Sequence, residues 1–210
     1  MRRTIDTGSV VTEAEYLRVR TLVMGPDRLD EDRLLAQAGV PPRFLHAAHP
    51  RAVEVGNALL DGCNAYLCGP VGTFKTTLAC AALRQVVRHG AACRFVPARR
   101  LIDELKAAIR DGSDPLPAYQ GTPVLVLDDL GKEPATGWCL ERVFALVDER
   151  HNRMLPTLVT TQYEPGALIA RLAREGDRDT ATAIVSRLRQ DCLKVATEGR
   201  DARAPERGQR

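Results

Sequence analysis

The chain has 210 residues, of which 44% are hydrophobic and 27% are charged, and its formal net charge is +3. This length accommodates one domain with a substantial core, and the small net charge excludes a chain dominated by one sign of charge. Only four of the 30 basic residues are Lys. The many Arg side chains favour forked contacts to phosphate and carboxylate groups, but they are spread along the chain, as composition bias in the gene would also leave them.

The cysteines and the apolar segments indicate where the protein is found. The six cysteines include no C-x-x-C pair, and several lie in apolar segments, so neither a zinc site nor a disulfide framework is predicted. No stretch of 18 apolar residues is present, and the N-terminus, MRRTIDTGSVVTEAEYLRVR, lacks the apolar centre of a signal peptide. We therefore expect a cytoplasmic protein that does not bind a membrane.

The first residues predict a short helical segment. Thr12 and Glu15 form a capping-box pattern, which predicts a helix that starts there, and a second helix is expected at about 31–38. The sequence VPPRF at 40–44 cannot continue that helix, because its two prolines lack backbone donors and disfavour helical geometry in the residues before them. We place a boundary there, so that residues 1–45 form an N-terminal segment that could bind a partner.

The core, predicted at residues 46–198, alternates helices with short apolar strands. Helices are expected at 52–61, 75–89, 98–110, 137–152, 165–174 and 180–190, and strands at 64–68, 93–96, 124–127, 157–161 and 192–196. This alternation predicts an α/β fold with a parallel sheet covered by helices on both faces. Residues 199–210 are polar and show no periodicity, which predicts a loosely held tail.

The sequence GPVGTFKTT follows the first core strand and enters a helix. A glycine-containing loop in this position can direct backbone N–H groups and the positive end of the helix dipole at phosphate. Lys75 would bridge the terminal phosphates of ATP, and the Thr76 hydroxyl would hold Mg²⁺. The predicted nucleotide-binding residues are Gly69, Pro70, Val71, Gly72, Thr73, Phe74, Lys75, Thr76 and Thr77.

Phe74 departs from the usual pattern of this loop, G-x-x-x-x-G-K-[ST]. It stands in place of the second glycine, where the backbone approaches phosphate closely. The loop alone is therefore also compatible with an ordinary glycine-rich turn between a strand and a helix.

Two adjacent carboxylates follow the apolar strand VLVL, about 50 residues after the loop. Asp128 would hold Mg²⁺ through its water shell, and Asp129 would orient the attacking water, since phosphoryl transfer depends on positioning and on charge neutralisation. A polar turn after a core strand is the alternative. The loop upstream favours the catalytic interpretation.

Two further polar residues are weaker candidates for the same site. Gln162 follows the strand at 157–161 and could hydrogen-bond the water or the terminal phosphate. Arg187 lies on the last predicted helix and could stabilise the charge that develops on the transferred phosphoryl group. From the residues alone, a solvated helix face is the better explanation of Arg187.

Together these residues resemble those of the DnaC/IstB-like family of AAA+ ATPases, the bacterial and phage helicase loaders and transposition helper ATPases. The resemblance covers most of the chain. It is carried by AGVPPRF (38–44), YLCGPVGTFKTTLA (66–79), FVPARRLIDELK (95–106), VLVLDDLGKEPATGW (124–138), LPTLVTTQY (155–163), SRLRQDC (186–192) and GRDAR (199–203).

The resemblance implies an AAA+ P-loop NTPase fold, a three-layer sandwich with a parallel five-stranded sheet, and it implies ATP and Mg²⁺ as ligands. It assigns the phosphate loop to 69–77, a Walker B pair to Asp128 and Asp129, and the sensor-1 position to Gln162, where Asn is commoner. It also assigns the arginine finger to Arg187. In this family the finger reaches the nucleotide of the neighbouring subunit, so a homo-oligomer is implied.

The leading hypothesis is an ATPase that assembles on DNA and loads or remodels a replicative helicase or another replication or transposition protein. Single-stranded DNA could be gripped by Lys, Arg and hydroxyl groups lining a ring, although no segment interleaves aromatic and basic residues. One alternative is a degenerate adaptor that keeps the AAA+ shape without ATP turnover, for which Phe74 is the evidence. A small-molecule kinase with the same loop explains neither Arg187 nor the extended resemblance.

Overall fold

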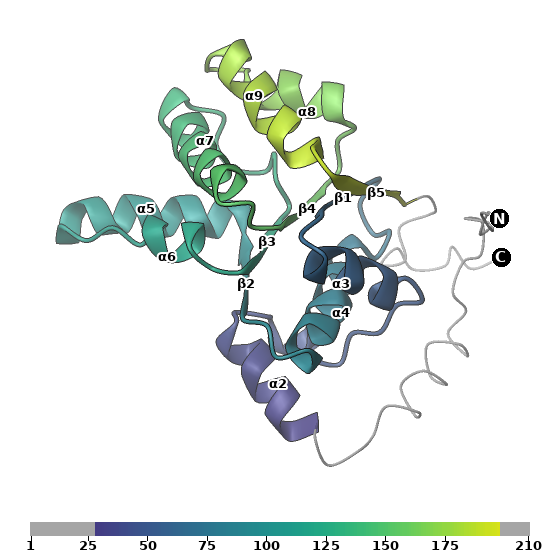
Figure 1. The fold of residues 1–210 in the computed structure, drawn as a ribbon. Helices are drawn as coiled ribbons and strands as arrows, with labels where there is room; N and C mark the ends of the chain where they lie inside the picture. Colours follow the sequence, from purple (N-terminus) through teal and green to yellow (C-terminus); the bar gives the residue numbers. More distant parts are fainter. Residues whose placement is uncertain (1–27, 198–210) are drawn as a thin grey trace, which may run out of the picture.

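The computed structural model describes residues 28–197, and they form a five-stranded parallel sheet between two layers of helices (Figure 1). The strands are β1 (Asn64–Cys68), β2 (Cys93–Pro97), β3 (Val124–Asp128), β4 (Thr157–Thr161) and β5 (Cys192–Ala196). Their order in the sheet is β2-β3-β4-β1-β5, and every pairing is parallel. The carboxyl ends of all five strands therefore lie at one edge, where α/β sheets bind their ligands.

The helices divide between the two faces of the sheet (Figure 1). One face carries α2 (Arg28–Gln37), the short 3₁₀ helix η1 (Pro42–Phe44), α3 (Ala52–Leu60) and α4 (Lys75–Arg88). The other carries α5 (Ala98–Asp111), α6 (Leu116–Gln120), α7 (Gly137–Asn152), α8 (Pro165–Leu172) and α9 (Arg178–Arg189). The predicted α/β fold and its three layers are confirmed.

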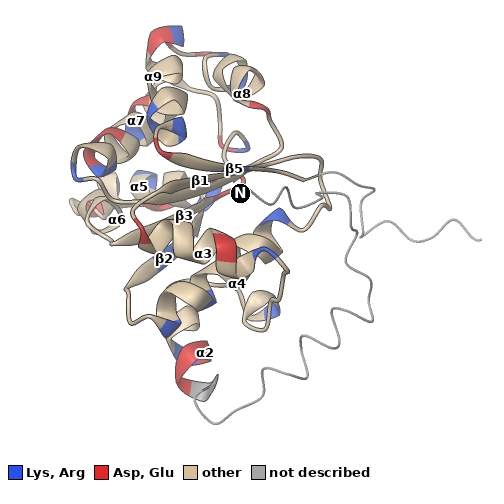
Figure 2. Ribbon diagram, turned by 45° about the vertical axis from the view of Figure 1, so that its right-hand side comes forward, with Lys and Arg blue, Asp and Glu red and all other residues tan. Residues whose placement is uncertain are grey.

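The three central strands, β1, β3 and β4, are buried on both faces, and β3 shows how they join the two cores. Leu125 and Leu127 pack among the side chains of α5 to α9, whereas Val124 and Val126 pack against those of α3 and α4. Successive residues of a strand point to opposite faces, so a continuous apolar run fills both cores. In Figure 2 the charged residues accordingly lie mainly on helices and loops, and the strands are mostly uncharged.

Helix α2 is held against the core by charged and backbone contacts. The buried Arg84 of α4 donates to Glu31 at 2.7 Å and to Asp32 at 2.6 Å, both of which lie on α2. At the end of this segment the backbone N–H of Phe95 donates to the carbonyl of Ala38 at 2.7 Å. These contacts join α2 to both α4 and β2.

The division of the chain into residues 1–45, 46–198 and 199–210 stays a prediction. The helix predicted from Thr12 and Glu15 and the polar tail both lie outside the described residues. Among residues 28–197 no helix is long and apolar enough to cross a membrane.

The predicted elements agree closely with those observed, with two additions. Strands β1, β4 and β5 and helix α7 have the expected bounds, and the other predicted elements differ by up to three residues at an end. The helices η1 and α6 were not predicted from the sequence, and each carries a proline in its first turn. Proline is accepted there because the first N–H groups of a helix have no partner within it.

Candidate nucleotide-binding site

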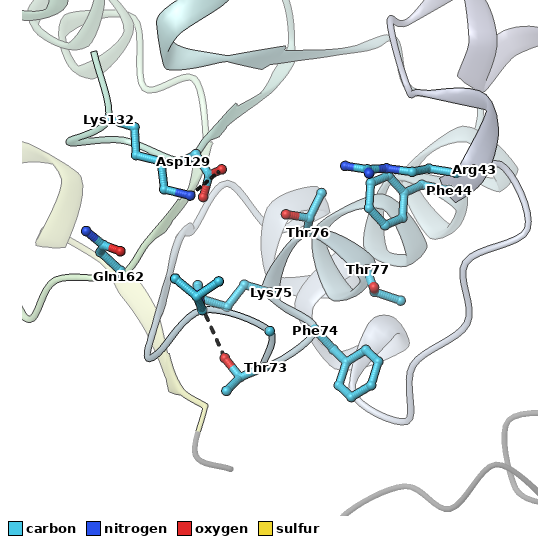
Figure 3. A pocket seen from close by; sticks show the side chains of 12 residues that line it. Arg43, Phe44, Thr73, Phe74, Lys75, Thr76, Thr77, Asp129, Lys132 and Gln162 are labelled. Carbon is cyan, nitrogen blue, oxygen red and sulfur yellow. Dashed lines mark hydrogen bonds and ion pairs between the residues drawn. The ribbon is translucent and has the colours of Figure 1, made fainter. Parts of the chain in front are cut away.

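A cavity of about 380 Å³ opens at the carboxyl edge of the sheet, around the loop between β1 and α4 (Figure 3). It is lined by Arg43, Phe44, Val71, Gly72, Thr73, Phe74, Lys75, Thr76, Thr77, Asp129, Lys132 and Gln162. The structure thus brings most of the predicted phosphate loop together with Asp129 and Gln162. Its size and its mixture of backbone and charged groups suit a nucleotide.

The loop has the backbone geometry of a phosphate cradle. Gly69 has φ of 148°, and a Cβ there would lie 2.1 Å from the carbonyl oxygen of Thr197, so only glycine fits. Phe74 has φ of 61° and ψ of 18°, the left-handed conformation that a glycine adopts freely. For a residue with a Cβ this conformation costs about 1 kcal/mol. Phe74 therefore follows the backbone path of the missing glycine.

The side chain of Phe74 points away from Lys75 (Figure 3), and 52% of it is exposed. The ring does not fill the space above the first turn of α4, where phosphate would lie. The departure at Phe74 therefore changes the rim of the cavity and leaves the path of the loop intact.

Lys75 is folded into its own loop. Only 7% of it is exposed, and its Nζ donates to the carbonyl of Gly69 at 2.7 Å and to that of Pro70. Burial lowers the pKa of Lys75, since the ammonium has lost part of its hydration, and the charge of Asp129 opposes this effect. Phosphate oxygens can replace these carbonyls as acceptors, so the ammonium lies where the nucleotide phosphates are expected.

Three side-chain oxygens meet beside the loop. The Thr76 hydroxyl donates to Asp128 Oδ1 at 3.0 Å, and the Thr160 hydroxyl donates to the same oxygen at 2.6 Å. Burial raises the pKa of the Asp128 carboxyl, and the hydrogen bonds from Thr160 and Thr76 oppose that rise.

The oxygens of Thr76 and Asp128 suit a hard divalent cation. Mg²⁺ takes oxygen ligands and is commonly held by one or two protein groups together with phosphates and waters. Within residues 28–197 no group of three or more His, Cys, Asp or Glu side chains is placed to hold a metal. The residues present therefore fit a divalent cation that the nucleotide itself helps to bind. That this cation is Mg²⁺ stays a prediction.

Asp129 stands at the cavity while Asp128 is buried beneath it. The backbone of Asp129 is left-handed, with φ of 58°, and its N–H donates to the Thr160 hydroxyl at 2.9 Å. Its carboxylate pairs with Lys132 at 3.0 Å. Gln162 is exposed and lies on the same side of the cavity as this pair (Figure 3). Asp129 and Gln162 are thus both open to a substrate.

Arg187 lies away from this cavity, at the opposite edge of the sheet. Asn64, the first residue of β1, donates to the carbonyl of Arg187 at 3.2 Å, whereas the phosphate loop leaves the last residue of β1. The guanidinium pairs with Asp148 at 2.8 Å and lies 5.1 Å from the centroid of the Phe144 ring. Arg187 is therefore not part of the phosphate site of its own chain.

Three residues of the cavity were not predicted from the sequence. Arg43 and Phe44 lie on the side opposite Asp129 (Figure 3), with the guanidinium carbon 4.5 Å from the centroid of the ring. Their segment, 38–44, carried the family resemblance, but no chemistry assigned it a role. Lys132 closes a turn three residues after Asp129, and a charged residue in a turn gives no distinctive signal.

The sheet order, the loop after β1 and the acidic end of β3 define a P-loop nucleotide-binding protein of the AAA+ class. The chain belongs to the family of IstB-like ATP-binding proteins, whose sequence profile matches residues 43–209. The resemblance seen in the sequence is thereby confirmed.

Curated relatives cover two kinds of protein. The chain is 26% identical over 147 residues to the replicative helicase loader DnaI of Bacillus subtilis. The matched region covers 67% of this chain and 47% of the relative. It is 28% identical over 142 residues to a putative insertion sequence ATP-binding protein, y4uH, of Sinorhizobium fredii, which covers 67% of this chain and 56% of that protein. The chain thus spans about half the length of these relatives.

Solved structures show the same fold. The crystal structure of the DnaC helicase loader matches with a TM-score of 0.62 and 25% identity, over 75% of this chain and 100% of that one. The crystal structure of DnaI matches with a TM-score of 0.57 and 23% identity, over 86% of this chain and 87% of that one. AMPPCP-bound DnaA from Aquifex aeolicus matches with a TM-score of 0.59 and 20% identity, over 76% of this chain and 51% of that one.

Proposed function

We propose that this protein is a cytoplasmic AAA+ ATPase that assembles as a homo-oligomer on DNA and loads or remodels a replicative helicase. The observation that carries the proposal is that Lys75 and Thr76 line one cavity at the carboxyl edge of the sheet and that Asp128 accepts the Thr76 hydroxyl beneath it. The relative named as a replicative helicase loader supports the choice of partner. Relatives named for insertion sequences favour a transposition protein instead. A pull-down against the replicative helicase of the host decides between these partners.

Each residue of the site has a role in this proposal. Lys75 and the backbone N–H groups of the loop bind the phosphates of ATP, and Thr76 and Asp128 hold Mg²⁺. The cation neutralises charge on the phosphates when it is bound. Asp129 and Gln162 orient the attacking water, and Arg187 acts on the nucleotide of a neighbouring subunit.

Replacing Lys75 by alanine tests the proposal most directly. We expect the affinity for ATP to fall by about 10-fold to 100-fold, because charge-assisted hydrogen bonds to phosphate are lost. Equilibrium binding of labelled ATP in the presence of Mg²⁺ measures the change. Lys194→Ala is the matched control, since that exposed lysine pairs with Glu164 outside the cavity. Equal affinities for wild type and Lys75→Ala would refute nucleotide binding at this loop.

An adaptor without ATP turnover is the second candidate function, and Phe74 is the observation that favours it. Because the backbone of Phe74 already has the left-handed conformation of a glycine, we expect Phe74→Gly to change the ATP affinity by less than about 10-fold. The same binding assay measures this effect.

Phe74→Ala separates the ring from the backbone. If the ring obstructs ATP, both variants gain affinity equally, and if the Cβ obstructs ATP, only Phe74→Gly gains. A gain well above 10-fold in Phe74→Gly would favour the adaptor.

A further inference from the structure

The turn that follows β3 is built to hold a lysine at the mouth of the cavity. The backbone N–H of Lys132 donates to the carbonyl of Asp129 at 3.1 Å, which closes the turn. The buried carboxylate of Glu133 accepts the N–H of Gly131 at 2.9 Å and so anchors the turn from below. One backbone hydrogen bond and one bond to the Glu133 carboxylate therefore fix the turn at position 132, while the Lys132 side chain lines the cavity.

The ammonium group of Lys132 is close to the groups that would act on ATP. Its Nζ lies 3.0 Å from Asp129 Oδ2, and its side chain lines the same cavity as Lys75 and Thr76 (Figure 3). Burial lowers the pKa of Lys75, and the positive charge of Lys132 adds to this lowering. The ammonium groups of Lys75 and Lys132 are thus close enough to interact electrostatically.

The charges around the cavity suit a contact between Lys132 and phosphate. Asp129 is open to the cavity, and an unpaired carboxylate there would repel a terminal phosphate. An ammonium group has three N–H donors, and within the described residues Lys132 Nζ has one hydrogen-bond acceptor, Asp129. The remaining donors can bind phosphate oxygens while the ion pair with Asp129 is kept.

We propose that Lys132 is a second phosphate-binding lysine, which bridges Asp129 and the terminal phosphate of ATP and makes the site prefer a triphosphate to a diphosphate. This inference rests on the proposed function, since it requires that ATP binds in the cavity. Lys75 binds the phosphates from the loop, and Lys132 binds the outermost phosphate from the end of β3. A diphosphate lacks this outermost phosphate, so the loss of the Lys132 charge is expected to act on ATP alone.

Lys132→Met tests the inference by binding and not by turnover. The affinities of wild type and variant are measured with Mg²⁺ for a non-hydrolysable ATP analogue and for ADP. We expect Lys132→Met to bind the analogue about 10-fold more weakly and ADP less than about 2-fold more weakly, since one charge-assisted hydrogen bond is removed from the triphosphate only. Lys132→Arg keeps the charge and should restore most of the preference. Lys194→Met is the control for loss of an exposed, paired lysine.

The other outcomes are distinct. If the ratio of the two affinities is the same in wild type and in Lys132→Met, Lys132 does not contact the terminal phosphate and the inference is wrong. A parallel loss of both affinities leaves this ratio unchanged and overturns the inference in the same way. If wild type binds neither nucleotide, the proposed function itself fails, and the inference fails with it.

Discussion

Arg187→Ala is expected to lower the rate of ATP hydrolysis by about 10³-fold or more while leaving the affinity for ATP nearly unchanged. An arginine that stabilises the charge on the transferred phosphoryl group contributes this much to phosphoryl transfer. Binding is unaffected because Arg187 lies at the amino end of β1, about 13 Å of strand away from the phosphate loop of its own chain. Steady-state hydrolysis and equilibrium binding of labelled ATP measure the two effects.

The contacts of Arg187 also allow a structural explanation for a loss of hydrolysis, and this explanation must be excluded. Its guanidinium pairs with Asp148 of α7, so the substitution could act by loosening α9 from α7. Melting of the variant, compared with Arg189→Ala on the same helix, detects such a loss of packing, since Arg189 is exposed. A variant that melts normally but does not hydrolyse ATP places the effect at the nucleotide.

Mixing two inactive variants decides whether the site is shared between subunits. Arg187→Ala keeps its own Asp129, and Asp129→Asn keeps its own Arg187. In a mixed oligomer some interfaces therefore combine an intact site with an intact finger, and hydrolysis should return in part. If the mixture stays inactive, or if Arg187→Ala hydrolyses ATP at the wild-type rate, the shared site is wrong.

The fold could be predicted from the sequence because its central strands are buried on both faces. A short apolar run such as residues 124–127 is typical of a central strand, and its spacing from helix-length patterns indicates a parallel sheet. Helix α6 was missed because Pro115 and Pro117 mark it as a turn. Short helices that begin with prolines depend on tertiary packing, which a local pattern does not contain.

The site could be predicted only where its chemistry follows a fixed spacing. Lys75 and the Asp pair occupy such positions, and the structure brings Lys75 and Asp129 to one cavity. The left-handed backbone conformation of Phe74 could not be predicted. The sequence pattern shows that a glycine is missing, but it does not show which conformation the residue in its place adopts. Arg43 and Lys132 come from segments that meet only after folding, so no spacing indicates them.

Arg150→Met is expected to lower the free energy of unfolding by about 3 to 5 kcal/mol, because several buried neutral acceptors lose their donor and each such loss costs about 1 to 3 kcal/mol. The side chain is 1% exposed, and burial lowers its pKa to about 10. The acceptors of its guanidinium are the Thr157 hydroxyl and the carbonyls of Tyr119, Gln120, Thr122, Pro123 and Pro156. Methionine fills much of the volume but removes the donor from these acceptors, of which the Pro156 carbonyl keeps the N–H of Leu125.

Arg150 lies on α7 and hydrogen-bonds the carbonyls just before the amino ends of β3 and β4. These strands carry Asp128 and Thr160 to the site. Unfolding in urea measures the loss of stability, and Arg150→Lys should recover only part of it, since one ammonium cannot span the acceptors. Arg153→Met is the matched control, because that side chain is 55% exposed and pairs with Glu149, a contact expected to contribute under about 1 kcal/mol. If Arg150→Met unfolds at the same urea concentration as Arg153→Met, the carbonyls find other donors and Arg150 does not hold the strands in place.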